Sequence, residues 1–498
     1  MIFAFGHGVR ANRIWVRVFS FLPFLVSATV AQQQSPIAYR LKYSGTGDHR
    51  VHITLTLPER LFQTTSFVMP RNYPGGYNLV LYDSFVENLR AFSAEGKPLK
   101  TAKETDGPRW RIKEGANGLQ RIEYDIDVNR MEQDLRASID ASKAREGYLG
   151  ILGYSVFGYI DGLQHRKIQL NVEAPKGWPV LTTLSPAVPA SKANASAEAN
   201  DYDALADSQV LMGPELRLTF IKGKIPLFMA VYSEGDADLS AEGQLARDAL
   251  DAMQAYFGNS PFAAYVVQLE LLRPIAGHSY GFSQEHMNSG TFSFTVTRAI
   301  TTRSSVEDKQ AALFNYAHHI AHCWIPKRAY GTGYSPFKWE MPPVIDTIWF
   351  NEGFARYAAI EALSESMSPA QQTAFRSGHF ARLRQILEDA PAFIREMPLL
   401  ELSREASFMY SLDFRIGQNT YARGALMAAE MDTRIRSSTG AERSLRDALR
   451  FLLDWTQRNQ RAFNAEELRG LLSQSTGVDL QDILARWLKP EPAPLPHS

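Results

Sequence analysis

Residues 308–324 are predicted to form a helix and carry His318-His319-Ile320-Ala321-His322-Cys323-Trp324 near their end. Apolar side chains recur there at intervals of three and four residues, so one face of the helix is apolar. His318 and His322 are four residues apart, and imidazoles at that spacing lie on the same side of a helix. A catalytic zinc ion takes three protein ligands and one open position. The pattern therefore predicts a metal site whose third ligand lies on another element.

A second predicted helix, residues 348–363, supplies the candidate for that ligand. Its first turns read Trp349-Phe350-Asn351-Glu352-Gly353-Phe354, and Asp346 is the expected cap before them. Glu352 is the natural third ligand, so we expect one Zn²⁺ ion held by His318, His322 and Glu352.

A rival metal pair is present on the same predicted helix. His319 and Cys323 are also four residues apart, but nothing else in the sequence completes that ligand set. Cys323 is better interpreted as a buried apolar side chain.

The regions around these helices differ in their periodicity. From about residue 37 to 224 the pattern alternates as in strands and is interrupted by turn residues, which predicts an all-β domain. After about residue 230 the period is helical, except for a strand expected at 265–272. Residues 185–206, rich in Ala, Ser, Asn and Pro, are interpreted as a surface loop. The fold class expected is a multidomain α+β protein.

The composition excludes several classes of protein. The 498 residues contain 45% hydrophobic and 21% charged residues, which is ordinary for folded globular chains. Lys+Arg and Asp+Glu both number 53, so no bulk charge attracts nucleic acid. A single cysteine excludes an intramolecular disulfide and any site built from several thiolates.

The ends of the chain predict export and a short tail. Residues 1–31 read as a signal peptide, with arginines before a short apolar run and small residues up to Ala31. An uncleaved membrane anchor is the alternative, but the run is short of the about 20 apolar residues of a span. We therefore expect a periplasmic or extracellular protein without stable membrane insertion. The proline-rich residues 490–498 are expected to be a disordered tail.

At these motifs the sequence resembles the glycyl aminopeptidase family of zinc metallopeptidases, M61, a relative of the M1 aminopeptidases. The family runs His-Glu-x-x-His, then Lys-Arg, then Trp-x-x-Glu-Gly-Phe, and residues 318–328 and 349–354 match in order and spacing. Three further stretches are similar to family segments: Tyr280-Gly281-Phe282-Ser283-Gln284-Glu285-His286, Tyr421-Ala422-Arg423-Gly424-Ala425 and Met69-Pro70-Arg71-Asn72-Tyr73-Pro74-Gly75-Gly76-Tyr77.

The resemblance implies a domain plan and two further site residues. It implies an N-terminal β-domain at 32–228, a thermolysin-like (gluzincin) catalytic domain at 229–400 and a helical C-terminal part at 401–489. Many members continue into a PDZ domain, and this sequence stops at Ser498 without one. Glu285 is expected to hold the free amine of a peptide substrate, and Tyr421 to stabilise the oxyanion. Their alternatives are a carboxylate paired with an arginine and a packed aromatic.

One departure from the family bears on activity. His319 stands where the family has the glutamate that takes a proton from water, a role worth about 10²–10⁴-fold. A neutral imidazole is a competent base, but a nearby Zn²⁺ disfavours its protonated form. Arg423 replaces the family's lysine and keeps the charge. The resemblance implies an aminopeptidase that removes Gly or Ala from peptide N-termini. The alternatives are a pseudopeptidase that binds N-termini without cutting them and a metal-dependent hydrolase of another kind.

Overall fold

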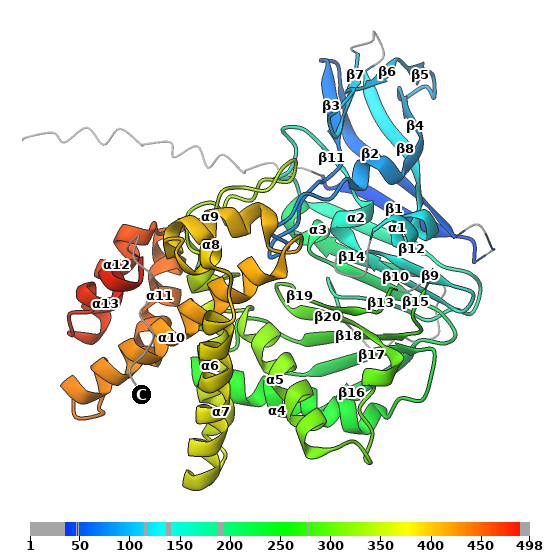
Figure 1. The fold of residues 1–498 in the computed structure, drawn as a ribbon. Coiled ribbons are helices and arrows are strands. Elements are labelled where there is room, and N and C mark those ends of the chain that lie inside the picture. The colour runs from blue at the N-terminus through cyan, green and yellow to red at the C-terminus, as the bar shows by residue number, and fades with distance from the viewer. Residues whose placement is uncertain are drawn as a thin grey trace, which may run out of the picture. The chain divides into compact units, whose positions relative to one another are not determined.

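The computed structural model describes residues 35–488, except 46, 48, 114–117, 136–140, 187–193 and 276–277. The predicted signal peptide, 1–31, and the predicted tail, 490–498, lie outside the described residues. Within the described part of the chain, we find no helix with the length and apolar character of a membrane span. The predicted α+β class is confirmed, since strands dominate the first half and helices the second (Figure 1).

The first region is built from three sheets around one apolar core. Strand β2 shows why the chain forms strands here, because Val51, Ile53 and Leu55 alternate with more exposed residues and are fully buried. The seven-stranded sheet has the order β14 (Asn194–Ala199), β12 (Ile168–Glu173), β1 (Ile37–Tyr43), β2 (Arg50–Leu61), β8 (Leu119–Asp127), β4 (Val86–Phe92) and β5 (Pro98–Leu99). The two four-stranded sheets have the orders β13 (Val180–Thr182), β15 (Gln209–Met212), β10 (Tyr148–Leu152), β9 (Lys143–Arg145) and β11 (Tyr159–Ile160), β3 (Thr65–Val68), β7 (Arg109–Ile112), β6 (Thr101–Lys103). Short helices connect them: η1 (Tyr82–Phe85), α1 (Val128–Asp134), α2 (Gly153–Val156) and α3 (Tyr202–Ala206).

A five-stranded sheet carries one wall of the site. Its order is β16 (Arg217–Ile221), β17 (Leu227–Ser233), β18 (Tyr265–Leu272), β20 (Ser289–Thr295) and β19 (Gly281–Glu285), with η2 (Val296–Arg298) after β20. The predicted strand at 265–272 is confirmed as β18, which is buried along its whole length between two parallel neighbours. Strand β19 is antiparallel to β20 and forms the edge of the sheet, so Glu285 lies at the end of an edge strand.

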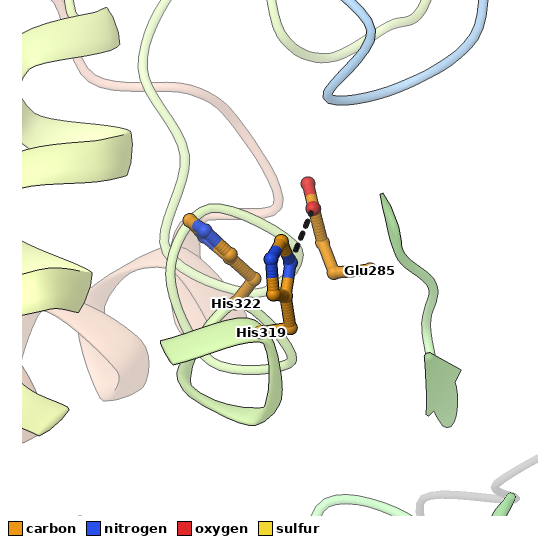
Figure 2. A group of neighbouring side chains, drawn as sticks. All are labelled: Glu285, His319 and His322. Carbon is orange, nitrogen blue, oxygen red and sulfur yellow. Dashed lines mark ion pairs between the residues drawn. The ribbon is translucent and has the colours of Figure 1, made fainter. Parts of the chain in front are cut away.

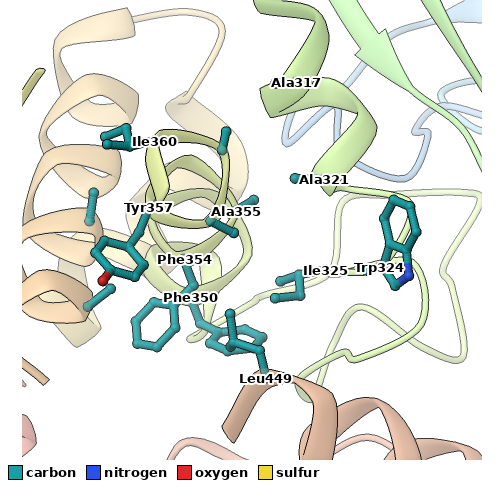
Figure 3. Packing of buried hydrophobic residues seen from close by; sticks show 14 of the residues in the cluster. Ala317, Ala321, Trp324, Ile325, Phe350, Phe354, Ala355, Tyr357, Ile360 and Leu449 are labelled. Atoms are coloured by element: carbon teal, nitrogen blue, oxygen red, sulfur yellow. The ribbon is translucent and has the colours of Figure 1, made fainter. Parts of the chain in front are cut away.

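Helices make up most of the remaining described chain. They are α4 (Leu239–Phe257), α5 (Val306–Ala321), α6 (Ile348–Ser364), α7 (Pro369–Glu388), α8 (Ala392–Arg395), α9 (Leu399–Met409), α10 (Phe414–Ser438), α11 (Leu445–Asn459), α12 (Ala465–Thr476) and α13 (Gln481–Leu488). Helix α5 begins where the Ser305 hydroxyl accepts a hydrogen bond from the Asp308 amide at 3.0 Å. Helix α6 is surrounded by apolar side chains, and sixteen of its seventeen residues are buried (Figure 3). This burial fixes the face that α6 turns toward α5.

Two glycines set the crossing of α6 and α10. A Cβ atom at Gly353 would lie 2.5 Å from the Gly424 backbone, and one at Gly424 would collide with the Trp349 carbonyl oxygen. The two backbones therefore touch directly. This contact fixes the distance between Glu352 on α6 and Tyr421 on α10.

Two sequence-based predictions are wrong. The loop expected at 185–206 contains β14 and α3. Alanines at alternate positions, Ala197 and Ala199, bury small side chains on this edge strand, a pattern that composition alone does not reveal. The N-cap of α6 is Thr347 rather than Asp346, whose backbone carbonyl instead accepts a hydrogen bond from the Trp349 indole. The domain boundary expected at 228 stays a prediction, and the five-stranded sheet already includes residues 217–221.

Candidate metal centre

Helices α5 and α6 bring His318, His322 and Glu352 together, and we call these residues the metal triad. The two Nε2 atoms are 3.4 Å apart. Oε2 of Glu352 lies 3.7 Å from Nε2 of His318 and 3.3 Å from Nε2 of His322. Ligand atoms about 2.0–2.1 Å from a tetrahedral zinc ion are about 3.3 Å apart. The spacing of the triad therefore fits a zinc ion.

The hydrogen bonds of the triad also fit a metal. Nδ1 of His322 contacts the Ile325 carbonyl oxygen at 2.8 Å. A carbonyl oxygen only accepts, so Nδ1 is the donor and the Nε2 lone pair is free to bind a cation. All three side chains are buried, and metal ligands in proteins commonly have such an outer hydrogen-bond partner.

In the protein without a cation, the two histidines of the triad have opposite pKa shifts. Burial and the neighbouring His322 hold the pKa of His318 well below its usual range, so His318 is neutral and able to bind a metal. Burial also opposes the charged form of His322, but Glu352 and Glu285 raise the pKa of His322 to about 9. A cation held by the triad would take over this favourable interaction with the carboxylates.

His319 turns toward Glu285 (Figure 2). Its Nδ1 lies 3.7 Å from Oε2 of Glu285, and its ring packs edge-on against Phe292 at 5.6 Å. Although burial opposes ionisation, His322 and His319 lower the pKa of Glu285 to about 2. The other carboxylate oxygen, Oε1, is buried without a hydrogen-bond partner among the described residues. Glu285 is thus an ionised carboxylate with one free oxygen.

A loop of the first region closes over this carboxylate. Gly75 has φ +93°, and a Cβ atom there would collide with Oε1 of Glu285. Only glycine allows so close an approach in this left-handed conformation. The segment at 69–77, selected from the sequence, is therefore in contact with the candidate amine site.

A second grouping of possible ligands shares one member with the triad. Glu285, His319 and His322 also have ligand atoms close enough to surround one ion. His322 offers only Nε2, because Nδ1 is bonded to Ile325. One cation therefore occupies either this grouping or the metal triad at a time.

The rival pair of His319 and Cys323 is not assembled in the structure. Cys323 belongs to neither grouping of possible ligands found among the described residues. Its thiol is buried and donates to the His286 carbonyl oxygen at 3.4 Å, and burial raises its pKa to about 12. The prediction of a buried apolar cysteine is confirmed.

Tyr421 lies beside the triad on α10. Its ring is 5.8 Å from the ring of His318, and burial together with the charge of Glu352 holds its pKa well above the usual range. The hydroxyl is therefore a protonated donor at neutral pH. A cavity of about 490 Å³ connects these groups, lined by Gly75, Gly76, Gly281, Phe282, Ser283, Gln284, Glu285, Asn315, His318, His319, Glu352, Arg356, Leu383, Ile386, Tyr410, Ser411, Phe414, Gln418 and Tyr421.

Arg423, which replaces the family's lysine, is hydrogen-bonded to the protein backbone. It is buried and donates hydrogen bonds to the carbonyl oxygens of Met397, Ile394 and Arg395 at 2.6 to 2.8 Å. Burial lowers its pKa to about 10. Arg423 thus satisfies the carbonyls at the end of α8 and does not line the cavity.

A buried charged cluster behind Glu285 was not recognised from the sequence. We call it the Asp207 cluster: Asp207, His286, Met287 and Lys327. Oδ1 of Asp207 accepts from Lys327 Nζ at 3.0 Å, and Oδ2 accepts from the Met287 amide at 2.6 Å. His286 Nδ1 is 3.4 Å from Oδ1. Because Asp207 belongs to the first region, the cluster ties that region to the residues that follow Glu285.

The N-terminal half of the chain matches a known domain. Residues 38–214 match the family described as the peptidase M61 N-terminal domain. A comparison with curated protein sequences finds no match.

Solved structures share the fold over most of the chain. An aminopeptidase N family protein from Idiomarina loihiensis has a TM-score of 0.79 at 19% identity, covering 91% of this chain and 76% of that chain. The M1 zinc metallopeptidase of Deinococcus radiodurans, solved as a variant bound to a Tyr-Ser-Ala substrate, has a TM-score of 0.54 at 16% identity, covering 93% and 95%. At these identities the likeness shows the fold, which is the predicted gluzincin type. The resemblance inferred from the motifs is thereby confirmed: residues 38–214 match the N-terminal domain of the M61 peptidases, and the fold is shared with aminopeptidase N and M1 zinc metallopeptidases.

Proposed function

We propose that this protein is an exported zinc metallopeptidase of the M61 type that removes Gly or Ala from peptide N-termini. The family and the fold are those of hydrolases that act on peptide bonds. The observation that carries the proposal is the metal triad, whose ligand atoms are 3.3 to 3.7 Å apart beside a cavity that also contains Glu285 and Tyr421.

Each side chain has a role that its surroundings support. Zinc held by the triad would polarise the scissile carbonyl and lower the pKa of water. Glu285 binds the substrate's ammonium group, since it is ionised and has a free oxygen. Tyr421 donates a hydrogen bond from its hydroxyl group to the developing oxyanion. The end of the cavity beside Gly75 favours peptides with a small N-terminal residue, because the loop leaves little space around the Glu285 carboxylate.

His319 is the base in this proposal. Burial lowers its pKa, although Glu285 opposes that shift, so the imidazole is neutral at physiological pH and able to accept a proton. It lines the cavity together with the triad residues.

The contact between His319 and Glu285 favours a second candidate function. Nδ1 of the imidazole lies 3.7 Å from one oxygen of the carboxylate that would bind the amine. A pseudopeptidase that binds N-termini, without a competent base, is consistent with that arrangement.

Hydrolysis of aminoacyl chromogenic substrates and of Tyr-Ser-Ala by the zinc-loaded protein tests the proposal. Activity in the wild type that is lost in Glu352→Ala supports the peptidase and makes His319 the base. An inactive wild type that His319→Glu activates by about 10²–10⁴-fold supports the binding protein instead. If the wild type and the His319→Glu variant are both inactive, and Glu285→Gln binds peptide as tightly as the wild type does, both functions are contradicted.

A further inference from the structure

Arg356 lies in the cavity without any use in the proposed chemistry. It follows Glu352 by four residues and therefore stands one turn further along the same face of α6. It is the one residue of α6 that is not buried, and it lines the cavity. The chain thus places a cation at the cavity wall, on a helix whose other residues are all buried.

Among the described residues, no hydrogen-bond acceptor is found for the guanidinium of Arg356. It lies over the rings of Phe314 at 5.0 Å and Tyr421 at 6.0 Å, and its Nε is buried without a hydrogen-bond partner. Arginine has five N–H donors, and leaving the buried Nε–H of Arg356 unpaired is unfavourable. The buried Arg423, in contrast, donates to three carbonyl oxygens. Arg356 is therefore held by aromatic rings in a position that leaves its donors free.

The charges around Arg356 favour an anion. Its neighbour Arg382, on α7, carries the same charge, and Glu352, one turn earlier on α6, is the carboxylate that acts on Arg356. Burial and these two arginines lower the pKa of His379 to about 4, so His379 adds no compensating group. The same cavity is lined by the carboxylate of Glu285 on β19. One cavity thus contains a site for a cation and a site for an anion.

We propose that Arg356 forms a carboxylate subsite, and that the ligand is a short peptide whose amine binds Glu285 and whose free C-terminal carboxylate binds Arg356. A planar guanidinium matches a carboxylate with two parallel hydrogen bonds. The cavity of about 490 Å³ has the size typical of small-ligand sites, which suits a di- or tripeptide. This inference rests on the proposed function for the placement of the amine.

Peptide binding to the protein freed of metal by a chelator tests the subsite without hydrolysis of the peptides. Calorimetry compares Ala-Ala-Ala with its C-terminal amide, and Ala-Glu-amide tests whether a side-chain carboxylate serves instead. We expect the free acid to bind about tenfold or more tightly than the amide. Arg356→Gln removes this difference, Arg356→Lys retains part of it, and the exposed neighbour Arg384→Gln on α7 leaves it unchanged.

The outcomes separate the subsite from the proposed function. Equal binding of acid and amide, or a preference that persists in Arg356→Gln, overturns the subsite while leaving peptide binding and hydrolysis intact. Tighter binding of Ala-Glu-amide than of Ala-Ala-Ala supports the carboxylate subsite and assigns it to an acidic side chain. Absence of binding by every peptide overturns the subsite and the proposed function together.

Discussion

The Asp207 cluster and the metal triad are both buried and charged, yet their polar atoms are satisfied differently. Both oxygens of Asp207 accept hydrogen bonds, from the Lys327 ammonium and the Met287 amide. In the triad, Nε2 atoms and a carboxylate oxygen face one another, and Nδ1 of His318 has no hydrogen-bond partner among the described residues. The protein supplies every hydrogen-bond partner of the Asp207 carboxylate, and this cluster joins two regions of the chain. The metal triad contains a polar atom without such a partner in the described part of the chain, an arrangement suited to a ligand.

The largest expected effect comes from breaking the Asp207 cluster. Asp207→Asn leaves the buried ammonium of Lys327 without its counter-charge, so unfolding should become easier by about 3–5 kcal/mol. Asp161→Asn is the matched control, because that carboxylate is 43% exposed in its pair with Arg109 and its loss should cost under about 1 kcal/mol. Urea unfolding measures both. Equal losses in the two variants would contradict the comparison.

Adding zinc should stabilise the protein through the triad. At free zinc about 100 times its dissociation constant, mass action adds about 2.7 kcal/mol to the free energy of unfolding. His322→Ala should abolish this gain, whereas His278→Ala, which removes an exposed histidine outside the triad, should keep it. Thermal unfolding with and without zinc provides the measurement. A zinc-dependent gain that survives in His322→Ala would place the metal elsewhere.

The smallest effect is the acid dependence of stability. Burial disfavours the ionised form of Asp207, but Lys327 and His286 lower the pKa of Asp207 from 3.8 to about 2. A carboxyl group with a lowered pKa stabilises the fold above its unfolded value, and this contribution is lost as the pH falls through about 2. The contribution amounts to about 2 kcal/mol. Unfolding between pH 5 and pH 2 should therefore be flatter in Asp207→Asn than in the wild type, and identical slopes would contradict the assignment.

The parts of the site that follow from local spacing were predictable from the sequence. His318, in the last turn of α5, and His322, its C-cap, come together because of helical geometry, and the predicted bounds 348–363 agree within a residue with α6. The motif resemblance added Glu285 and Tyr421 to the predicted site residues, and both line one cavity in the structure.

The parts that depend on a missing partner were not predictable. The sequence shows that position 356 is arginine, but only the packing of the described residues shows that its buried Nε has no hydrogen-bond partner. The pairing of His319 with Glu285 likewise joins α5 to a strand edge across the cavity, and no periodicity encodes it. Asp207 lies in the first region, 120 residues before Lys327, so their contact depends on the tertiary fold.

The crossing of α6 and α10 limits how this protein can be redesigned. Phe414 lines the cavity and is half exposed, so its exchange is a way to reshape the cavity. Gly353 and Gly424 are different, since their backbones are in contact and a single added methyl group has no space. The separation between the candidate metal ligand Glu352 and Tyr421 is therefore a constant of the scaffold, which an engineer who alters specificity has to keep.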